Sequence, residues 1–556
     1  MRDVASPRLW SFSGQEWLFL LAVISGWGVL AVALGKDVGW DFLNYHWYVA
    51  YALLHGRLGF DVAVAHHATY FNPLIHVPFY LLATLASSWI ALFYLGALQG
   101  LNIIPLYWMS RSALSPGAAR WNAVALALIG MAGSTAVSMI RKTSYDQSLL
   151  SALVLSGLAL LIVGRTILQT QSRAAMGLAA LSGLLVGVAV GLKPAEGPYA
   201  VGIALALLMP AGTSGTRVAR LAAGAAGGLL GILLTGAPWS VMLARYSGNP
   251  LFPFFNGLMH STLIGGGSFL DLRFIPHGWW AVLSFPLRFA IHYAVADDVA
   301  FRDLRIPFLY VLIPLACILW FSGRRPRAPL VSPQVAWILF AFCAASYAAW
   351  LRELAVYRYI VALEMLAPLV IAAAAGLLPL SVRVRIAITA LLLAVSAVLG
   401  RYAPGPYAPL GDPYVQLSAL SIPHPEHSMI LMTGYEPMAY IIPSLPAPIP
   451  VLRIQGWLAG PGDGSGLSAG MRERVARHTG DLFLLASPLA RADAVRATAQ
   501  LQLRIVASRC QQLTTNLGGP YDFCPLVAIE PPPAEAAPVA LRPVGGDLPA
   551  VIEPSR

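Results

Sequence analysis

Near its N-terminal end the chain carries an apolar stretch followed directly by a polar and aromatic one. Residues 16–35 read EWLFLLAVISGWGVLAVALG, and residues 36–46 read KDVGWDFLNYH. About twenty mostly apolar residues are what an α-helix needs to cross a bilayer. We therefore predict a membrane-spanning helix over 16–35. The acidic, aromatic and histidine residues that follow it in the sequence should then lie at the membrane surface.

The composition of the whole chain has the same character. Of the 556 residues, 58% are hydrophobic and 11% are charged, whereas soluble globular proteins have about 25% charged residues. A large soluble enzyme is thereby excluded. A mainly disordered chain is excluded too, because there is ample apolar surface to bury. Four cysteines are too few for a disulfide scaffold or a cysteine-rich metal site.

Ten further apolar segments predict a mainly α-helical, polytopic transmembrane protein with about eleven spans. They cover residues 88–110, 121–140, 148–164, 176–192, 198–212, 221–239, 306–323, 333–350, 359–378 and 386–400. Arginines recur in every second connection, at Arg2, Arg8, Arg111, Arg120, Arg165, Arg173, Arg217, Arg220, Arg324, Arg325, Arg327, Arg383 and Arg385. Because cytoplasmic loops retain basic residues, we predict a cytoplasmic N-terminus. We attribute the net charge of +11 to these loops and expect no nucleic-acid partner.

Several segments interrupt the alternation of spans and short loops. Within a membrane domain over 1–400, residues 36–87 form a long first external loop and residues 240–305 a second large external segment. Residues 401–530 predict a small extracytoplasmic α/β domain, and 531–556 a disordered tail rich in proline and alanine. The domain should have strands at 428–433, 450–454, 481–486 and 524–529 and helices at 472–478 and 492–502. Cys510 and Cys524 lie outside the membrane in this topology, where an oxidising compartment would let them pair.

Ionisable residues gather on the predicted external face. Charged groups at membrane level are costly unless they pair or line a cavity, so their concentration on one face indicates a functional site there. The candidates are Asp37, Asp41, Tyr45, His46 and Arg57 in the first loop, Arg141, Lys142 and Asp146 in the next, and Lys193, Arg352, Glu353 and Arg358 farther along the chain.

The lysines single out part of this set. Only three of the 36 basic residues are lysines, namely Lys36, Lys142 and Lys193, and all three lie at predicted external ends of spans. A compact ammonium group retained in an arginine-rich chain indicates phosphate binding or a narrow pocket. The alternatives are chance placement and, for Lys36, a side chain that reaches from the apolar region to the membrane surface.

Asp41 heads the most informative segment. It lies four residues before Tyr45, on one face of a predicted interfacial helix that runs through Leu54 and also presents Tyr48. The carboxylate either takes part in chemistry or only caps this helix. The neighbouring histidines and aromatic residues favour the first interpretation.

The sequence gives no clear metal site. Asp37 and Asp41 would share a cation only if the chain between them were helical, and Gly39 argues against a helix. The histidines His46, His55 and His76 are expected to be interfacial or hydrogen-bonded rather than ligands, and no zinc-type spacing follows His66 and His67. We therefore expect no bound metal, and a requirement for a divalent ion stays open.

Three short strings accompany these features: YFNPL at 70–74, GNPLFP at 248–253, and Arg358-Tyr359 followed by Glu364. Together with the aspartate behind the first span, the long first external loop and the external C-terminal domain, they resemble the GT-C class of membrane glycosyltransferases. The likeness covers residues 16–400 in organisation. The strings are short, and no motif within the C-terminal domain can be assigned.

This resemblance implies an inverting transfer of one hexose or pentose. The donor would be a polyprenyl-phosphate sugar, and the acceptor a glycan, a lipid or a protein at the external face. Asp41 would be the general base, with Asp37 or Asp146 as alternatives. The leaving phosphate would be bound by Lys142, Lys193, Arg352 and Arg358, with Arg141 behind them. Arg358 has the alternative of a structural ion pair with Glu353 or Glu364.

The composition, rich in arginine and alanine, indicates a bacterial inner membrane with the site facing the periplasm. The Phe252, Phe254 and Phe255 side chains are expected to border a groove for the isoprenoid chain. Two other readings stay open: a transporter or flippase of lipid-linked saccharides, and a non-catalytic partner in surface polysaccharide assembly. Transporters usually place their ionisable groups near the bilayer midplane, whereas this chain places them at one face.

Overall fold

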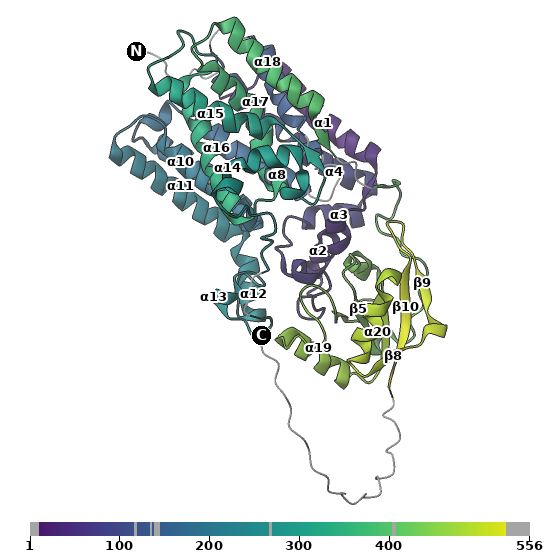
Figure 1. Ribbon diagram of the computed structural model, residues 1–556. Helices are drawn as coiled ribbons and strands as arrows, with labels where there is room; N and C mark the ends of the chain where they lie inside the picture. The colour runs from purple at the N-terminus through teal and green to yellow at the C-terminus, as the bar shows by residue number, and fades with distance from the viewer. Residues whose placement is uncertain are drawn as a thin grey trace, which may run out of the picture.

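The structure is a computed structural model, described for residues 10–115, 119–133, 136–137, 145–265, 269–402 and 407–529 (Figure 1). The predicted tail over 531–556 lies outside the described residues, as do Arg141 and Lys142. The described chain is mostly helical. Long helices form one bundle, and a small sheet domain from the C-terminal part of the chain lies at one end of it (Figure 1).

Among the described residues, eight helical segments are long and apolar enough to cross a membrane. They are formed by α1 (Gly14–Leu34), α4 with α5 (Ser88–Gly100 and Ile103–Ala113), α8 (Tyr145–Val163), α9 (Arg173–Leu192), α11 (Ser214–Thr235), α16 (Pro333–Glu353), α17 (Val361–Gly376) with the short helix before it, and α18 (Val382–Leu399). The shorter helices α6 (Arg120–Met131), α10 (Gly197–Leu208) and α15 (Arg305–Phe321) coincide with the other three predicted spans. The prediction of a helical membrane protein is confirmed at this level.

Contacts between connections define the two ends of the bundle. Three arginines at predicted cytoplasmic positions each reach a second predicted cytoplasmic connection: Arg111 pairs with Glu16 at 2.8 Å, Arg165 donates to Ser112 Oγ at 2.9 Å, and Arg385 donates to the Ala328 carbonyl at 2.7 Å. In the first external loop, Asn72 Nδ2 donates to the carbonyls of Gly191 at 3.0 Å and Thr235 at 2.9 Å. The predicted external connections therefore meet at the other end.

Helices α9 and α11 pack backbone against backbone along a stripe of glycines. A Cβ atom added at Gly183 would overlap the Gly224 carbonyl, and one added at Gly187 would overlap the Gly228 carbonyl. Small residues at such positions let membrane helices approach closely, since lipid-facing apolar surface gives little drive for association. This packing fixes the end of α9, directly before Lys193.

Replacing Gly187 with alanine should destabilise the protein by about 1–3 kcal/mol, because the new methyl group forces the two backbones apart. The matched control is Gly177→Ala on the same helix, where an added Cβ meets nothing within 4 Å. The control should leave stability unchanged or raise it slightly, because alanine favours the helix. Melting temperatures in detergent measure both effects, and equal values for the two variants would contradict the packing argument.

The sheet domain matches the predicted pattern. Its strands are β5 (Ser428–Thr433), β6 (Val451–Arg453), β7 (Asp481–Ala486), β8 (Leu503–Ile505), β9 (Gln511–Leu513) and β10 (Tyr521–Ala528), and its helices are α19 (Gly466–Arg477) and α20 (Arg491–Ala499). The strand order is β6-β5-β7-β10-β8, with β9 also paired to β10. β5 runs parallel to β6 and β7, whereas β10 is antiparallel to its neighbours. The four predicted strands and two predicted helices are confirmed. Cys510 and Cys524, whose pairing the sequence left open, form a disulfide.

The first external loop packs between the bundle and the sheet domain. A π-helix over Phe42–His46 leads into α2 (Trp47–Leu54), and α3 (Val77–Leu85) follows farther along the loop. Trp47 and Tyr48 belong to one apolar cluster with Ile430 and Phe483 of the sheet domain. Figure 1 shows α2 and α3 between the bundle and this domain. The aromatic residues of the predicted interfacial helix therefore find partners in the C-terminal domain, and its place at the membrane surface stays a prediction.

The second external segment completes the same end of the molecule. It contains α12 (Ala237–Ser247), α13 (Asn256–Met259) and α14 (Trp279–Ile291). Two short ladders also join distant parts of the chain: β1 (Lys36–Asp37) pairs with β4 (Tyr407–Ala408), and β2 (Phe301–Arg302) pairs with β3 (Arg401–Tyr402). The loops of the membrane domain and the entry of the chain into the sheet domain are thus tied together.

Candidate functional site

A cavity of about 230 Å³ lies among the first loop, the segment after α9, the end of α16 and the second external segment. Its lining combines two kinds of side chain. Six of the aromatic side chains come from Tyr70, Phe71, Phe252, Phe254, Phe255 and Phe269. The charged lining residues are Asp146, Lys193, Asp271, Glu353 and Arg358. The cavity therefore offers both apolar surface and ionic partners to one ligand.

Lys193 and Asp146 form an ion pair in this wall. Lys193 directly follows α9, Asp146 begins α8, and their Nζ and Oδ2 atoms are 2.7 Å apart. With its amide oriented to satisfy both neighbours, Gln147 accepts from Lys193 Nζ at 2.9 Å and donates to Glu196 Oε1 at 2.8 Å. Burial lowers the pKa of Lys193, but Asp146, Tyr359 and Glu196 together raise it above its usual value, so the ammonium stays charged. Two residues predicted separately thus act as one unit.

Arg358 pairs with a residue that the sequence analysis did not single out. Its NH1 atom lies 2.9 Å from Asp297 Oδ1, and its backbone N–H donates to Asp297 Oδ2 at 3.0 Å. The expected alternatives, Glu353 and Glu364, are not its partners in this pair. Glu364 lies fully buried in the bundle, near Arg305. The available signal for Asp297 was the acidic pair Asp297-Asp298 in the second external segment.

Asp41 interacts electrostatically with the charged groups of both ion pairs. Burial raises the pKa of its carboxyl above the usual value, while Arg358 and Lys193 act to lower it. Burial, followed by the Asp41 charge, also raises the pKa of Tyr45, which lines the cavity. Asp41 is not itself among the described lining residues. Its ionised form is favoured by two cations of that lining, Arg358 and Lys193.

The predicted shared face of Asp41, Tyr45 and Tyr48 is wrong for its last member. Tyr48 donates instead to Asp61 Oδ2 at 3.0 Å, away from the cavity lining. The π-helix between Asp41 and Trp47 is the physical reason, because its wider turn changes the angular spacing that a regular α-helix would give.

Four other candidates lie outside the cavity lining. Arg57 is buried, pairs with Asp61 at 2.7 Å and donates to the Ala447 and Ile449 carbonyls, so it joins the first loop to the sheet domain. Asp37 is buried in β1 and accepts from the Gly39 N–H at 2.7 Å. Lys36 Nζ donates to the carbonyls of Pro413 and Tyr414, both at 2.9 Å. Arg352 is exposed. The first three are held at the interface with the C-terminal part of the chain, which a sequence pattern does not reveal.

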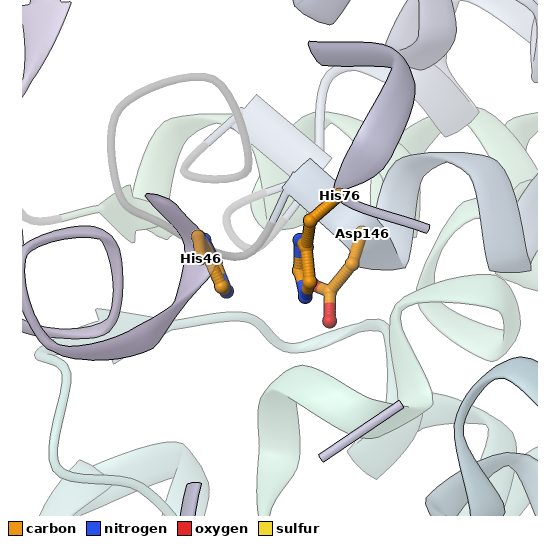
Figure 2. Close-up of side chains that lie close together, drawn as sticks. All are labelled: His46, His76 and Asp146. Carbon is orange, nitrogen blue, oxygen red and sulfur yellow. The ribbon is translucent and has the colours of Figure 1, made fainter. Parts of the chain in front are cut away.

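His46 and His76 also lie at this site, together with Asp146 (Figure 2). The two imidazole rings are stacked with their centroids 4.4 Å apart. Both residues are buried, so the expectation of interfacial histidines is wrong for them. Burial lowers the pKa of His46 well below its usual value and that of His76 to about 4. Both rings are therefore neutral at pH 7.

The two Asn-Pro strings shape the cavity. Asn72 links the first loop to the ends of α9 and α11, as described above. Asn249 Nδ2 donates to the Phe254 carbonyl at 2.9 Å, and its Oδ1 accepts from the Leu251 N–H at 2.8 Å. These bonds close the turn that carries the aromatic wall, and both strings contribute lining residues.

No protein family, curated protein or solved structure matches this chain.

Proposed function

We propose that this protein is a membrane glycosyltransferase that moves one sugar from a polyprenyl-phosphate donor to an acceptor, with inversion at the anomeric carbon. The observation that carries this proposal is the presence of aromatic and cationic side chains in the lining of one cavity. An isoprenoid chain needs apolar surface, and a phosphate needs cations. Aromatic residues such as Phe252 and Phe254 supply the first, and Lys193 and Arg358 supply the second, within one cavity.

In this proposal the cations stabilise the leaving group. The phosphate gains negative charge as the glycosidic bond breaks, and preorganised cations in a site shielded from water lower the energy of that transition state. Lys193 and Arg358 are suited to the task because Asp146 and Asp297 hold them at 2.7 Å and 2.9 Å before any ligand arrives. A phosphate then needs no reorganisation of these side chains.

Asp41 is the proposed general base. A base works best when its pKa approaches the working pH, and burial raises the pKa of Asp41 in that direction. It would accept the proton of the acceptor hydroxyl as that oxygen attacks the anomeric carbon. The base and the phosphate-binding cations then act on opposite faces of that carbon, as inversion requires.

We further propose eleven spans, a cytoplasmic N-terminus and a site that faces the periplasm of a bacterial inner membrane. The gathering of arginines such as Arg111 and Arg385 at the end opposite the cavity supports this orientation. The Cys510–Cys524 disulfide in the sheet domain also supports it, because disulfides persist in oxidising compartments.

Purified protein incubated with a panel of radiolabelled polyprenyl-phosphate sugars and candidate acceptors tests the reaction. Transfer of label from one donor class is the expected result. Movement of labelled lipid across reconstituted vesicles, with no transfer to any acceptor, would instead favour the flippase. Neither transfer nor movement, in protein that is folded, would favour a non-catalytic partner.

Phe254→Asp should raise the Michaelis constant for the lipid donor by about tenfold or more, because a charge in the aromatic wall opposes burial of the isoprenoid chain. The turnover number should change little, since the Phe254 side chain has no group that takes part in the proposed proton transfer. A donor with a truncated, water-soluble chain is the control, and its Michaelis constant should be nearly the same in both proteins. An unchanged constant for the long-chain donor would contradict a lipid role for this wall.

A further inference from the structure

Three buried side chains from separate segments meet at the edge of the cavity. His46 ends the π-helix of the first loop, His76 directly precedes α3, and Asp146 begins α8. They are 0%, 2% and 3% exposed. One nitrogen from each histidine and one carboxylate oxygen lie within 4.8 Å of one another (Figure 2).

We propose that His46, His76 and Asp146 together bind one divalent transition-metal ion of the zinc class. Two imidazole nitrogens and one carboxylate oxygen form a donor set that zinc uses in sites with three protein ligands, where the fourth position stays open. Magnesium and calcium prefer oxygen donors, so the two imidazoles disfavour both. Neutral imidazole is the form of histidine that binds such an ion.

The geometry needs only a small closure of the side chains. Donor atoms around a tetrahedral zinc ion lie about 3.3 Å apart, which follows from metal–ligand distances of about 2.0–2.1 Å. The present separations of up to 4.8 Å therefore shorten by about 1.5 Å at most when the ion binds. Rotation of the imidazole rings and of the carboxylate supplies such a change without movement of the helices.

The surroundings of Asp146 already orient its carboxylate. Its Oδ1 atom accepts from the Gln147 N–H at 2.9 Å, and its Oδ2 atom pairs with Lys193. Partners of this kind fix the direction of a ligand and tune its affinity. His76 and Asp146 also line the cavity, which gives an ion a route to the site.

Two opposite charges lie beside the histidines. The charged groups that act on both His46 and His76 are the Asp146 carboxylate and the Lys193 ammonium. The Asp146 carboxylate therefore supplies the negative charge that attracts a dication, in spite of the nearby ammonium group. Once bound, it would tie the first external loop to the start of α8.

Zinc titration of chelator-treated protein in detergent tests this site, with metal content after desalting as the readout. Wild-type protein should retain one zinc ion per chain. The variants His46→Gln and His76→Gln should each bind zinc about 100-fold more weakly or worse, because even loss of an outer-shell partner costs about 10- to 100-fold in metal affinity. Cobalt bound in place of zinc should give the visible absorption of a low-coordinate site in wild type, but not in His46→Gln or His76→Gln.

The matched control is His55→Gln, which removes a histidine of the same loop that contacts only its own helix through Tyr51 in the bonds observed. It should bind zinc like wild type. Zinc should also raise the melting temperature of wild type and His55→Gln but not of His76→Gln, since a ligand that binds the folded state stabilises it. Equal zinc retention by all four proteins, or no retention by folded wild type, would overturn the proposal. Neither zinc retention nor the melting temperature depends on sugar transfer. The experiment therefore tests the metal site independently of the proposed transferase activity.

Discussion

Replacing Asp41 with asparagine should lower the turnover number of sugar transfer by about 100- to 10,000-fold, the usual contribution of a general base. The amide keeps the shape of the side chain but has no basic oxygen of comparable strength. Donor binding should persist, because the phosphate contacts come from Lys193 and Arg358. Turnover and donor affinity, measured on purified protein, separate these two effects.

Asp37→Asn is the matched control. Asp37 belongs to the same loop, but it lies in β1 and its carboxylate accepts from the Gly39 N–H. Its replacement should change turnover much less than that of Asp41. Full activity of Asp41→Asn would contradict the assigned role and would move the search for a base to Asp146.

The pH profile gives a second readout for Asp41. The base works only when it is ionised, and burial raises its pKa above the usual 3.8. Turnover in wild type should therefore fall as the pH decreases through this raised pKa, and the turnover of Asp41→Asn should not show this acidic decrease.

The raised pKa of Asp41 also affects stability, because the folded state holds this proton more tightly than the unfolded chain. The carboxyl's contribution to stability is therefore present below the ordinary pKa and lost as the pH rises through the folded one. Asp41→Asn should accordingly be as stable as wild type at pH 7, or more stable.

Lys193→Met should lower the stability of the protein by about 3–5 kcal/mol and also abolish efficient transfer. The stability loss follows because Asp146 is left as a buried charge without its cation. The activity loss follows because the leaving phosphate loses a positive charge. Thermal unfolding and transfer assays on the same preparation measure the two effects.

The double variant Lys193→Met/Asp146→Asn separates them. Removing both charges should restore much of the stability, since neutral partners avoid the cost of an isolated buried charge, but transfer should stay lost. Arg352→Met removes an exposed cation at the same end of the molecule and should change stability by no more than about 0.5 kcal/mol. A double variant no more stable than Lys193→Met would show that the unpaired charge is not the cause.

The helical membrane domain and the elements of the sheet domain could be predicted because they depend on short-range patterns. The tendency of a segment such as residues 16–35 to enter a bilayer depends on its own length and hydropathy and not on neighbouring segments. β5 and β7 coincide with the predicted strands because short apolar runs between turn residues favour that structure. The close packing of α9 against α11 was not predicted, although Gly183, Gly187 and Gly191 recur at four-residue spacing in the sequence.

The candidate site could be predicted only in part. The sequence identified Asp41, Lys193 and Arg358 as unusual, because charge near a membrane is costly. It did not identify the partners, since Asp146 lies 47 residues from Lys193 and Asp297 lies 61 residues from Arg358. Arg57 has the same residue type and predicted face as the site residues, yet it stabilises the interface with the sheet domain.

The sequence by itself therefore determined which segments form long apolar helices and indicated that ionisable residues gather at one end of them. The tertiary structure alone decided which of these residues meet in the cavity and which are bound elsewhere. The physical reason is that the two outcomes depend on interactions of different range along the chain. Transfer of a helix from water to lipid is a sum over consecutive residues, whereas a buried charge is stabilised by whatever partner the packing of distant segments brings within about 3 Å.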